Sequence, residues 1–286
     1  MNDKRKSIID CAYKLFKEKG YLETSIQDIL EASSISKGTF YKYFTSKGSL
    51  TLELLQQLQE KLNMELHILL LNDDVKDEEE LIRKAICHIK NFESEHALRP
   101  IIGEAIIEKQ PALLAFIKEN RQKSLQWLYN RMKIAFGNRY PHGVLDATLF
   151  LQALIKELTK MNESTNQAIP IEAIVDSSFN KMLLCMEEMN SHPLFESERL
   201  IFQENSISNT ERFMNKTLQL GQWLKKDFGD HPKKELFFEY LRFLARNREQ
   251  LGHFPSMVNQ MIQDFEQYLG GRYPAIHEYI QLLKNL

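Results

Sequence analysis

The segment that decides the fold is Ser36–Phe44, SKGTFYKYF, near the start of a 286-residue chain. It combines aromatic rings, two lysines and small polar residues within nine positions. Phe40 and Phe44 are four residues apart, so a helix places both rings on one face. The pattern predicts a short helix that buries these two rings and leaves its lysine, tyrosine and threonine side chains exposed to a partner.

The sequence before this segment predicts two further helices. Residues 4–19 have the apolar spacing of an amphipathic helix, which Gly20 ends. Thr24–Ser25 can cap a second helix, residues 32–35 form a turn, and Ser36 caps the third helix. Two short helices joined by a tight turn and braced by a preceding helix make a helix-turn-helix, whose second helix enters the major groove of DNA.

The polar side of the third helix matches the chemistry of DNA. Gly38 lets the backbone approach the duplex, and Thr39 can reach a base edge or a thymine methyl group. Tyrosine hydroxyls and lysine ammonium groups suit phosphate oxygens, and Lys47 in the next helix is expected to bind a phosphate as well. The residues that this pattern predicts to face DNA are Ser36, Lys37, Gly38, Thr39, Tyr41, Lys42, Tyr43 and Lys47.

The charge distribution separates the start of the chain from the rest. Residues 1–48 contain nine Lys or Arg and six Asp or Glu, a net charge of +3. The whole chain carries −2, so the remainder carries −5. A small basic region on an acidic remainder indicates that the N-terminal region, and not the body, meets an anion.

Several classes of protein are not favoured by the sequence. No apolar run approaches the ~20 residues that a membrane span needs, and charges interrupt the N-terminus, so we expect a cytoplasmic protein without membrane association. Cys11, Cys87 and Cys185 are far apart and lack metal-ligand spacing. Because no nucleophile–base pair, metal cluster or glycine-rich phosphate loop occurs, we expect neither an enzyme nor a bound cofactor or metal.

Residues 20–50, GYLETSIQDILEASSISKGTFYKYFTSKGSL, resemble the DNA-binding domain of the TetR/AcrR transcriptional regulators. The resemblance implies a homodimer that binds a palindromic double-stranded DNA operator, usually as a repressor released by a small molecule. It also implies DNA contacts from Thr24 and Ser25 in addition to the residues named above. The matching features are Gly20-Tyr21, Thr24-Ser25-Ile26, Asp28-Ile29, Ser36–Phe44 and Ser46-Lys47.

Two positions depart from the pattern of the resembled family. The turn reads Ser33-Ser34-Ile35 where Ala-Gly-Val is usual, and Gly48 stands where glutamate is usual. Ser34 must therefore accept a turn geometry that glycine adopts at lower cost. Neither departure removes a predicted DNA contact.

The remaining sequence predicts helices throughout, so the expected fold is all-α. A long helix from Ser46 to about Leu71 connects the DNA-binding region to a second layer of helices. Apolar periodicity, with prolines at or near the starts, predicts further helices at about 78–95, 100–108, 111–137, 141–161 and 170–190. The expected domains are a helix-turn-helix domain at 1–47, a helical ligand-binding and dimerisation domain at 48–204 and a C-terminal helical extension at 205–286.

Two of these helices, 141–161 and 170–190, are apolar over a wide arc, which indicates burial on two sides. The family resemblance implies that they form a four-helix dimer face with the same helices of a second copy. The alternative is the core of a monomer. The residues expected in the dimer interface are Leu149, Ile155, Ile174, Phe179, Met182 and Met186.

An effector pocket is expected among the helices of residues 78–137. The alternative for each candidate side chain is ordinary core packing, and the alternative function is a DNA-binding regulator or DNA-occupying protein controlled by a protein partner with no small-molecule ligand. Arg99, Glu104 and Tyr129 are the candidate polar groups of the pocket. The candidate contacts to a small, largely apolar effector are Phe92, His96, Phe116, Trp127, Met132 and Phe136.

The C-terminal extension, residues 205–286, continues beyond the usual length of the resembled family. Apolar residues such as Phe213, Trp223, Phe237 and Phe265 recur in it at helical spacing, so it must fold. A segment of about 80 residues gives only a marginal core by itself. We therefore expect the extension to form a helical subdomain that packs on the body.

Overall fold

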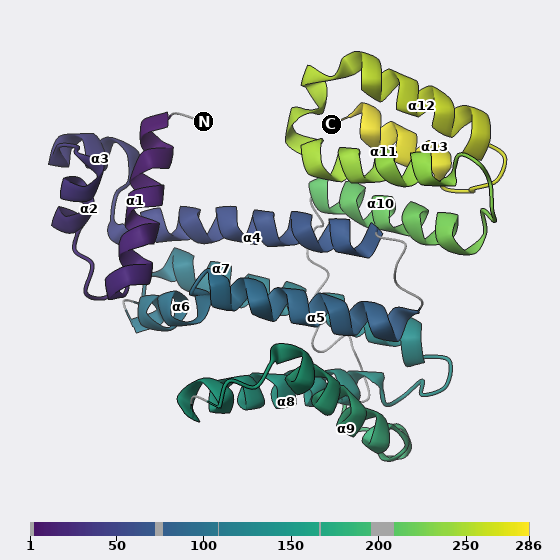
Figure 1. Cartoon of the computed structure of the whole chain (residues 1–286), viewed down its shortest axis with the longest axis horizontal. Helices are drawn as coiled ribbons and strands as arrows, with labels where there is room; N and C mark the ends of the chain where they lie inside the picture. Colours follow the sequence, from purple (N-terminus) through teal and green to yellow (C-terminus); the bar gives the residue numbers. More distant parts are fainter. Residues whose placement is uncertain (1–2, 72–76, 108, 166, 196–208, 286) are drawn as a thin grey trace. The chain divides into compact units, whose positions relative to one another are not determined.

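The computed structural model describes residues 3–71, 77–107, 109–165, 167–195 and 209–285, and every regular element in these ranges is a helix (Figure 1). The predicted all-α fold is therefore confirmed. None of the described helices is long and apolar enough to cross a membrane. The helices are α1 (Asp3–Lys19), α2 (Ile26–Ser33), α3 (Lys37–Tyr43), α4 (Lys47–Leu71), α5 (Glu78–Glu95), α6 (Leu98–Ile107), α7 (Pro111–Phe136), α8 (Val144–Thr165), α9 (Ile171–Ser191), α10 (Asn209–Lys226), α11 (Lys234–Asn247), the 3-10 helix η2 (Arg248–His253), α12 (Pro255–Leu269) and α13 (Ile276–Lys284).

Helices α1–α3, which we call the head, are held by helix caps around a small apolar core. The Ser25 hydroxyl accepts a hydrogen bond from the Asp28 N–H, and the Asp28 carboxylate accepts one from the Ser25 N–H. This reciprocal pair is a capping box, in which Ser25 is one of the two residues expected to cap α2. Ser36 caps α3 by accepting a hydrogen bond from the Thr39 N–H at 3.2 Å. The fully buried side chains of the head include Ile8, Ile9, Tyr21, Ile29 and Phe40.

The turn between α2 and α3 uses serine in a backbone conformation that favours glycine. Ser34 has a φ of 53°, in the left-handed region, and its N–H donates to the last carbonyls of α2. This conformation costs a non-glycine residue about 1 kcal/mol. The sequence-based expectation for this turn is confirmed by the backbone.

Helix α4 continues from the head as one helix of 25 residues. Leucines at four-residue spacing, Leu50, Leu54, Leu58 and Leu62, are buried along it. The Arg5 guanidinium ties α1 to α4, because its Nε donates to Glu53 Oε1 at 2.9 Å.

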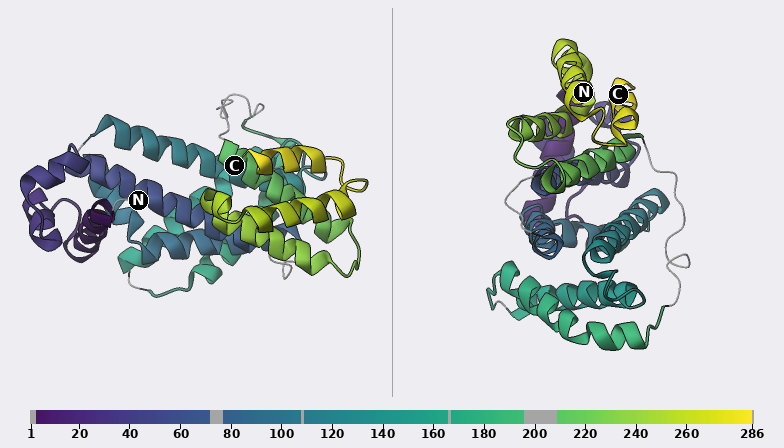
Figure 2. Two further views of the ribbon diagram at one scale, coloured as in Figure 1. Left: turned by 90° about the horizontal axis from the view of Figure 1, so that it is seen from above. Right: turned by 90° about the vertical axis from the view of Figure 1, so that its right-hand side faces the viewer.

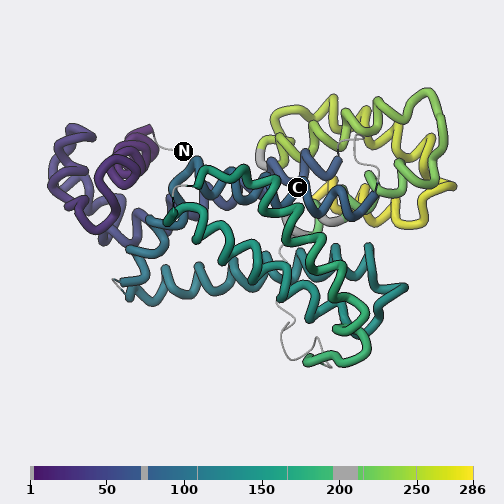
Figure 3. Tube along the Cα trace, turned by 60° about the horizontal axis from the view of Figure 1, so that its bottom comes forward, coloured from purple at the N-terminus to yellow at the C-terminus, as the bar shows by residue number. Residues whose placement is uncertain are grey.

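In the body, helices α5–α9, one apolar core is shared by α5, α7, α8 and α9. Buried side chains from α5, α7, α8 and α9, such as Ile82, Met132, Leu151 and Phe179, belong to a single cluster. Helices α8 and α9 lie side by side along their length and pack against α7 and α5 (Figures 2 and 3). Because both helices contribute their apolar sides to this core, much of the wide apolar arc is used within one chain.

The chain divides into two compact units, and the division differs from the predicted domains. The first unit is Met1–Leu62 with Glu78–Phe202, so the head and the body belong together. The second unit is Asn63–Asp77 with Gln203–Leu286, so the end of α4 belongs with the C-terminal extension. The predicted boundary between residues 204 and 205 lies outside the described residues.

The second unit has an apolar and aromatic core of its own. The rings of Phe213 and Tyr279 stack with centroids 5.5 Å apart, and those of Phe237 and Phe265 stack at 5.7 Å. The hydroxyls of Tyr279 and Thr217 lie 3.1 Å apart inside this core. The apolar residues that recur along the extension therefore form the interior of a folded helical unit.

Candidate nucleic-acid interface

Helix α3 exposes the polar residues that the sequence assigns to DNA and buries its two phenylalanines. Phe40 is fully buried and Phe44 nearly so, whereas Tyr41 is 46% exposed. The helix carries two lysines and no acidic residue, so its exposed surface is positively charged. Of the other predicted contacts in this segment, Ser36, Lys37, Gly38 and Lys42 are exposed, and Thr39 and Tyr43 are half-buried.

The start of α3 presents two hydroxyl groups close together. Ser36 Oγ lies 2.9 Å from Thr39 Oγ1 and caps the helix through the Thr39 N–H. The cap fixes both side chains, while Ser36 remains exposed. Hydroxyl groups both donate and accept hydrogen bonds, so this pair can meet phosphate oxygens or base edges in the major groove.

The start of α2 carries a second exposed hydroxyl, that of Ser25. Its Oγ donates to the Asp28 carboxylate at 2.7 Å, and Lys19 Nζ lies 2.8 Å from the other carboxylate oxygen. The Lys19 ammonium, with the hydroxyl and N–H of Ser25, holds the pKa of Asp28 well below its usual range. The carboxylate that orients Ser25 therefore stays ionised at neutral pH.

The structure corrects the predicted role of Thr24. Its side chain is fully buried, and its hydroxyl donates to the Gly20 carbonyl at 2.6 Å. A buried hydroxyl with an internal acceptor cannot contact DNA. The sequence places Thr24 and Ser25 next to each other at a helix start and does not show which of the two turns inward.

Lys47, a predicted phosphate contact, is half-buried and also makes contacts within the protein. Its ammonium donates to the carbonyls of Tyr21 and Thr24, at 3.0 and 3.2 Å, and lies 4.1 Å from the centre of the Tyr21 ring. These contacts join the start of α4 to the loop before α2. Lys47 therefore helps to hold the helix-turn-helix in place, and its phosphate contact stays a prediction.

Comparisons with known proteins identify the family of this head. The family model described as "Bacterial regulatory proteins, tetR family" matches residues 8–54. EthR of Mycobacterium tuberculosis, an HTH-type transcriptional regulator, is 31% identical over 164 residues, which cover 57% of this chain and 74% of EthR. The chain belongs to the TetR family of DNA-binding transcriptional regulators.

Further relatives of this TetR-family chain come from Bacillus. Two HTH-type transcriptional regulators of Bacillus subtilis match it: YuxN is 49% identical over 61 residues and YerO 24% over 160. These matches span only 21% of YuxN and 54% of YerO. The fatty acid degradation regulator FadR from Bacillus halodurans has a TM-score of 0.51 and 17% identity over 69% of this chain and 99% of its own. That likeness concerns the fold.

The predicted effector residues of this TetR-family body do not form one group. Trp127, Met132 and Phe136 belong to the core that α7 shares with α8 and α9, where the ring of Phe136 is 6.1 Å from that of Phe179. Met132 is fully buried there, and Phe116 lies half-buried nearer the start of α7. Ordinary core packing, the alternative to effector binding, therefore accounts for the positions of Trp127, Met132 and Phe136.

The other two candidates, Phe92 and His96, lie where the body meets the head. Their rings stack with centroids 3.9 Å apart, and the His96 ring also stacks on Tyr13 of α1 at 6.3 Å. His96 Nε2 lies 3.2 Å from Lys61 Nζ of α4. Nearby, Lys17 Nζ donates to the backbone carbonyl of residue 95 at 2.8 Å. This end of α5 is thus a junction with α1 and α4.

The candidate polar groups are also engaged in internal contacts. Arg99 forms an ion pair with Glu163, and Tyr129 is buried. Glu104 of α6 reaches the head, where its Oε2 accepts a hydrogen bond from the Leu22 N–H at 2.8 Å. The Leu22 N–H belongs to the loop before α2, so α6 holds the helix-turn-helix directly.

The surroundings of position 48 account for the glycine that stands where the family usually has glutamate. A Cβ atom at this position would lie 1.8 Å from Gln110 Oε1. The Gln110 side chain, at the start of α7, therefore occupies the space that a larger residue at position 48 would need. This closeness of Gln110 to the first turn of α4 was not predicted, and the unusual glycine was the available signal for it.

Most residues predicted for the dimer interface are buried within one protomer. Phe179, Met182 and Met186 are fully buried, and Ile155 and Ile174 are 3% and 5% exposed. Leu149 alone among the six is partly exposed. The five buried residues fit the alternative of a protomer core, because a wide apolar arc reveals that two sides are buried without revealing which side faces the same chain. Their place in a dimer interface stays a prediction. The large apolar residues exposed on these helices are Leu158, Met161 and Leu184, at 37%, 60% and 85%.

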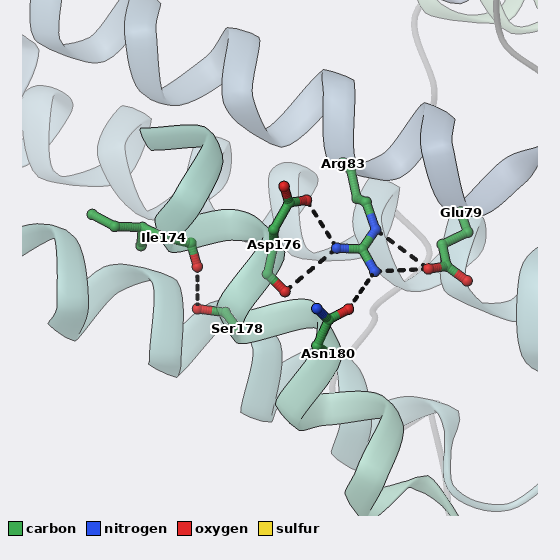
Figure 4. Close-up of polar contacts among 6 residues, drawn as sticks. All are labelled: Glu79, Arg83, Ile174, Asp176, Ser178 and Asn180. Carbon is green, nitrogen blue, oxygen red and sulfur yellow. Dashed lines mark hydrogen bonds and ion pairs between the residues drawn. The ribbon is translucent and has the colours of Figure 1, made fainter. Parts of the chain in front are cut away.

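Arg83 joins α5 to α9 (Figure 4). Its guanidinium donates to the Glu79 carboxylate at 2.7 Å, to Asp176 Oδ1 at 3.0 Å and to the Asn180 side-chain oxygen at 3.0 Å. It also lies 4.1 Å from the centre of the Phe179 ring. The side chain is only 18% exposed. Arg83 therefore links the position of α5 in this region to α9. Within the described ranges, no group of His, Cys, Asp or Glu side chains is arranged to hold a metal ion.

Proposed function

We propose that this TetR-family regulator is a repressor that binds a palindromic operator as a homodimer and is released by a small, largely apolar effector. Dimeric operator binding is supported by the family. An apolar effector is supported by the fold shared with FadR, which is a fatty acid degradation regulator. The exposed polar surface of α3 supplies the DNA-binding part of the proposal.

The proposed DNA surface consists of exposed and half-buried residues at the starts of α2 and α3. Thr39 is the candidate for base recognition, because it lies at the start of the helix that enters the major groove. The lysines and tyrosines are candidates for phosphate binding. The proposed contacts are Ser25, Ser36, Lys37, Gly38, Thr39, Tyr41, Lys42 and Tyr43.

The proposed dimer face consists of the outward sides of α8 and α9. Leu184 is 85% exposed on α9, and Met161 and Leu158 are exposed on α8. Single exposed apolar residues need no explanation, but these three belong to the two helices that the family resemblance assigns to dimerisation. We therefore place the interface on this side and not on the buried residues that the sequence first suggested.

The observation that carries effector control is the hydrogen bond from the Leu22 N–H to Glu104. It connects α6 of the body to the loop that precedes α2, at 2.8 Å and with a charged acceptor. Hydrogen bonds to charged groups are among the stronger ones in proteins. An effector that moves α6 would break or shift this contact and so change the position of the helix-turn-helix.

The test begins with an operator selected from random duplex DNA by the wild-type full-length protein. Fatty acids of different chain length and aromatic acids are then screened for release of the labelled operator, measured by fluorescence anisotropy. An effector should raise the operator Kd by about fivefold to 150-fold, the usual range of coupling between two sites. If no compound releases the operator and a purified protein does, control by a protein partner replaces this proposal.

The role of Glu104 is tested with the Glu104→Gln variant. The amide keeps the size of the side chain and removes its charge, so the bond to the Leu22 N–H weakens. We expect the effector to bind with nearly unchanged affinity while its effect on the operator Kd decreases. The matched control is Glu119→Gln on α7, whose carboxylate pairs with Lys123 at the surface. An unchanged release ratio in Glu104→Gln would show that α6 does not transmit the signal through this contact.

A further inference from the structure

Helix α4 belongs to both compact units of the chain. Its residues up to Leu62 are part of the first unit, and its residues from Asn63 to Leu71 are part of the second. The single helix α4 therefore contributes residues to both units. Because α4 is one continuous helix, the contacts of Asn63–Leu71 and those of its first turns act on the same element.

The last turn of α4 is enclosed by the C-terminal extension. Leu71 is fully buried and Leu70 is 6% exposed. A Cβ atom placed on Gly221 of α10 would lie 2.6 Å from Leu71 Cδ2. The same Cβ atom would lie 3.6 Å from Leu241 Cδ1 and 3.8 Å from Phe238 Cε1 of α11. Gly221 therefore lets α10 approach Leu71, and α11 completes this apolar contact.

The first turns of α4 are fixed to the head. Arg5 of α1 donates to the Glu53 carboxylate, and Lys47 donates to the carbonyls of Tyr21 and Thr24. Leu50 is fully buried at this end. A displacement of α4 along or about its axis would therefore change the support of the helix-turn-helix.

We propose that the C-terminal extension is a second control element, which sets operator affinity through the contacts of α10 and α11 with Leu71 at the end of α4. The extension has an aromatic core of its own and still uses α4 residues to complete its unit. The FadR likeness covers 99% of that chain with only 69% of this one, so the rest of this chain lies outside the shared fold. Control from the extension is independent of the effector and of the Glu104 contact.

The proposal predicts that the contact between positions 71 and 221 is coupled to DNA binding. Gly221→Leu inserts a side chain where Leu71 lies, and Leu71→Ala removes the opposing side chain. The double variant restores apolar volume across the same contact. The probe is the duplex selected by the wild-type protein, and no effector is present, so the result does not depend on effector control.

We expect Gly221→Leu to change the operator Kd by at least about fivefold and the double variant to return it toward the wild-type value. The matched control is Gly252→Leu in η2 of the same unit, where an added Cβ meets nothing within 4 Å. Near-ultraviolet circular dichroism and thermal unfolding establish that each variant is folded.

An operator Kd within about twofold of wild type in a folded Gly221→Leu protein would overturn the proposal, since typical coupling is larger. An equal change in Gly252→Leu would also overturn it. If Gly221→Leu does not fold, Leu71→Ala decides the matter alone. That variant loosens the contact by leaving a cavity, and an unchanged operator Kd in the folded protein would then contradict the inference.

Discussion

Helices α3 and α9 both combine apolar and polar residues, and they use their exposed sides in opposite ways. In α3 the fully buried Phe40 is followed by Tyr41, which is 46% exposed and belongs to a polar surface. In α9 the fully buried Phe179 precedes Leu184, which is 85% exposed and apolar. A short helix on a small core has one buried side, whereas a long helix can offer apolar residues both to its own chain and to a partner.

The largest expected effect comes from Phe179→Lys, which tests the buried side of α9. The substitution places an ammonium group in an apolar core, close to the Arg83 guanidinium, which already engages the nearby carboxylates of Glu79 and Asp176. Burial of an unpaired charge costs several kcal/mol. We expect the protein to lose its cooperative thermal unfolding transition, measured by far-ultraviolet circular dichroism. A variant that is stable and folded but monomeric would instead indicate that Phe179 lies in the dimer interface.

The same substitution on the exposed side of α9, Leu184→Lys, should leave the protomer folded. We expect sedimentation equilibrium to show a shift from dimer to monomer, with weaker operator binding, because the charge enters an apolar interface between two copies. The thermal transition at low concentration should change little. Ile134→Lys on α7 is the control, since this side chain is 55% exposed and lies on neither dimerisation helix. If the Leu184→Lys protein remained a dimer, the dimer interface would have to lie on another side of the protomer.

The smallest effects distinguish two lysines of the DNA-binding region. Lys42→Ala should weaken binding to all DNA sequences and reduce the salt dependence of binding by about one phosphate. Lys47→Ala removes a brace behind the helix-turn-helix, so we expect a lower melting temperature and weaker binding with an unchanged salt slope. Fluorescence anisotropy over a range of salt concentrations measures both. A reduced salt slope in Lys47→Ala would instead support the phosphate contact that the sequence predicts for Lys47.

The sequence predicted the head well because its structure is determined locally. The spacing of Phe40 and Phe44, the cap at Ser36 and the capping box of α2 involve residues within a few positions of one another. The position of Thr24 could not be predicted from such local patterns. Its burial depends on the Gly20 carbonyl and on packing around Tyr21, which a helix-start pattern shared with Ser25 does not contain.

The body was predicted as helices but not as contacts. Helix positions follow from periodicity and prolines, whereas the partner of each apolar face depends on packing between distant segments. Glu104 of α6 contacts the head, and Gln110 at the start of α7 lies against the first turn of α4, both far away in sequence from their partners. Only the unusual Gly48 indicated such a contact. For the same reason, the effector candidates divided between the α7 core and the α5 junction.

The Arg83 contacts have a consequence for how the regulator would respond to its own abundance. They connect α5, near the candidate effector region, to α9, which carries the proposed dimer face. If effector binding moves α5, it must also change the affinity of one protomer for another, and linkage requires the reverse to hold equally. Effector potency would then depend on the cellular concentration of the protein. A cell that makes more of the regulator would change not only how much operator is occupied but also how much effector is needed to clear it.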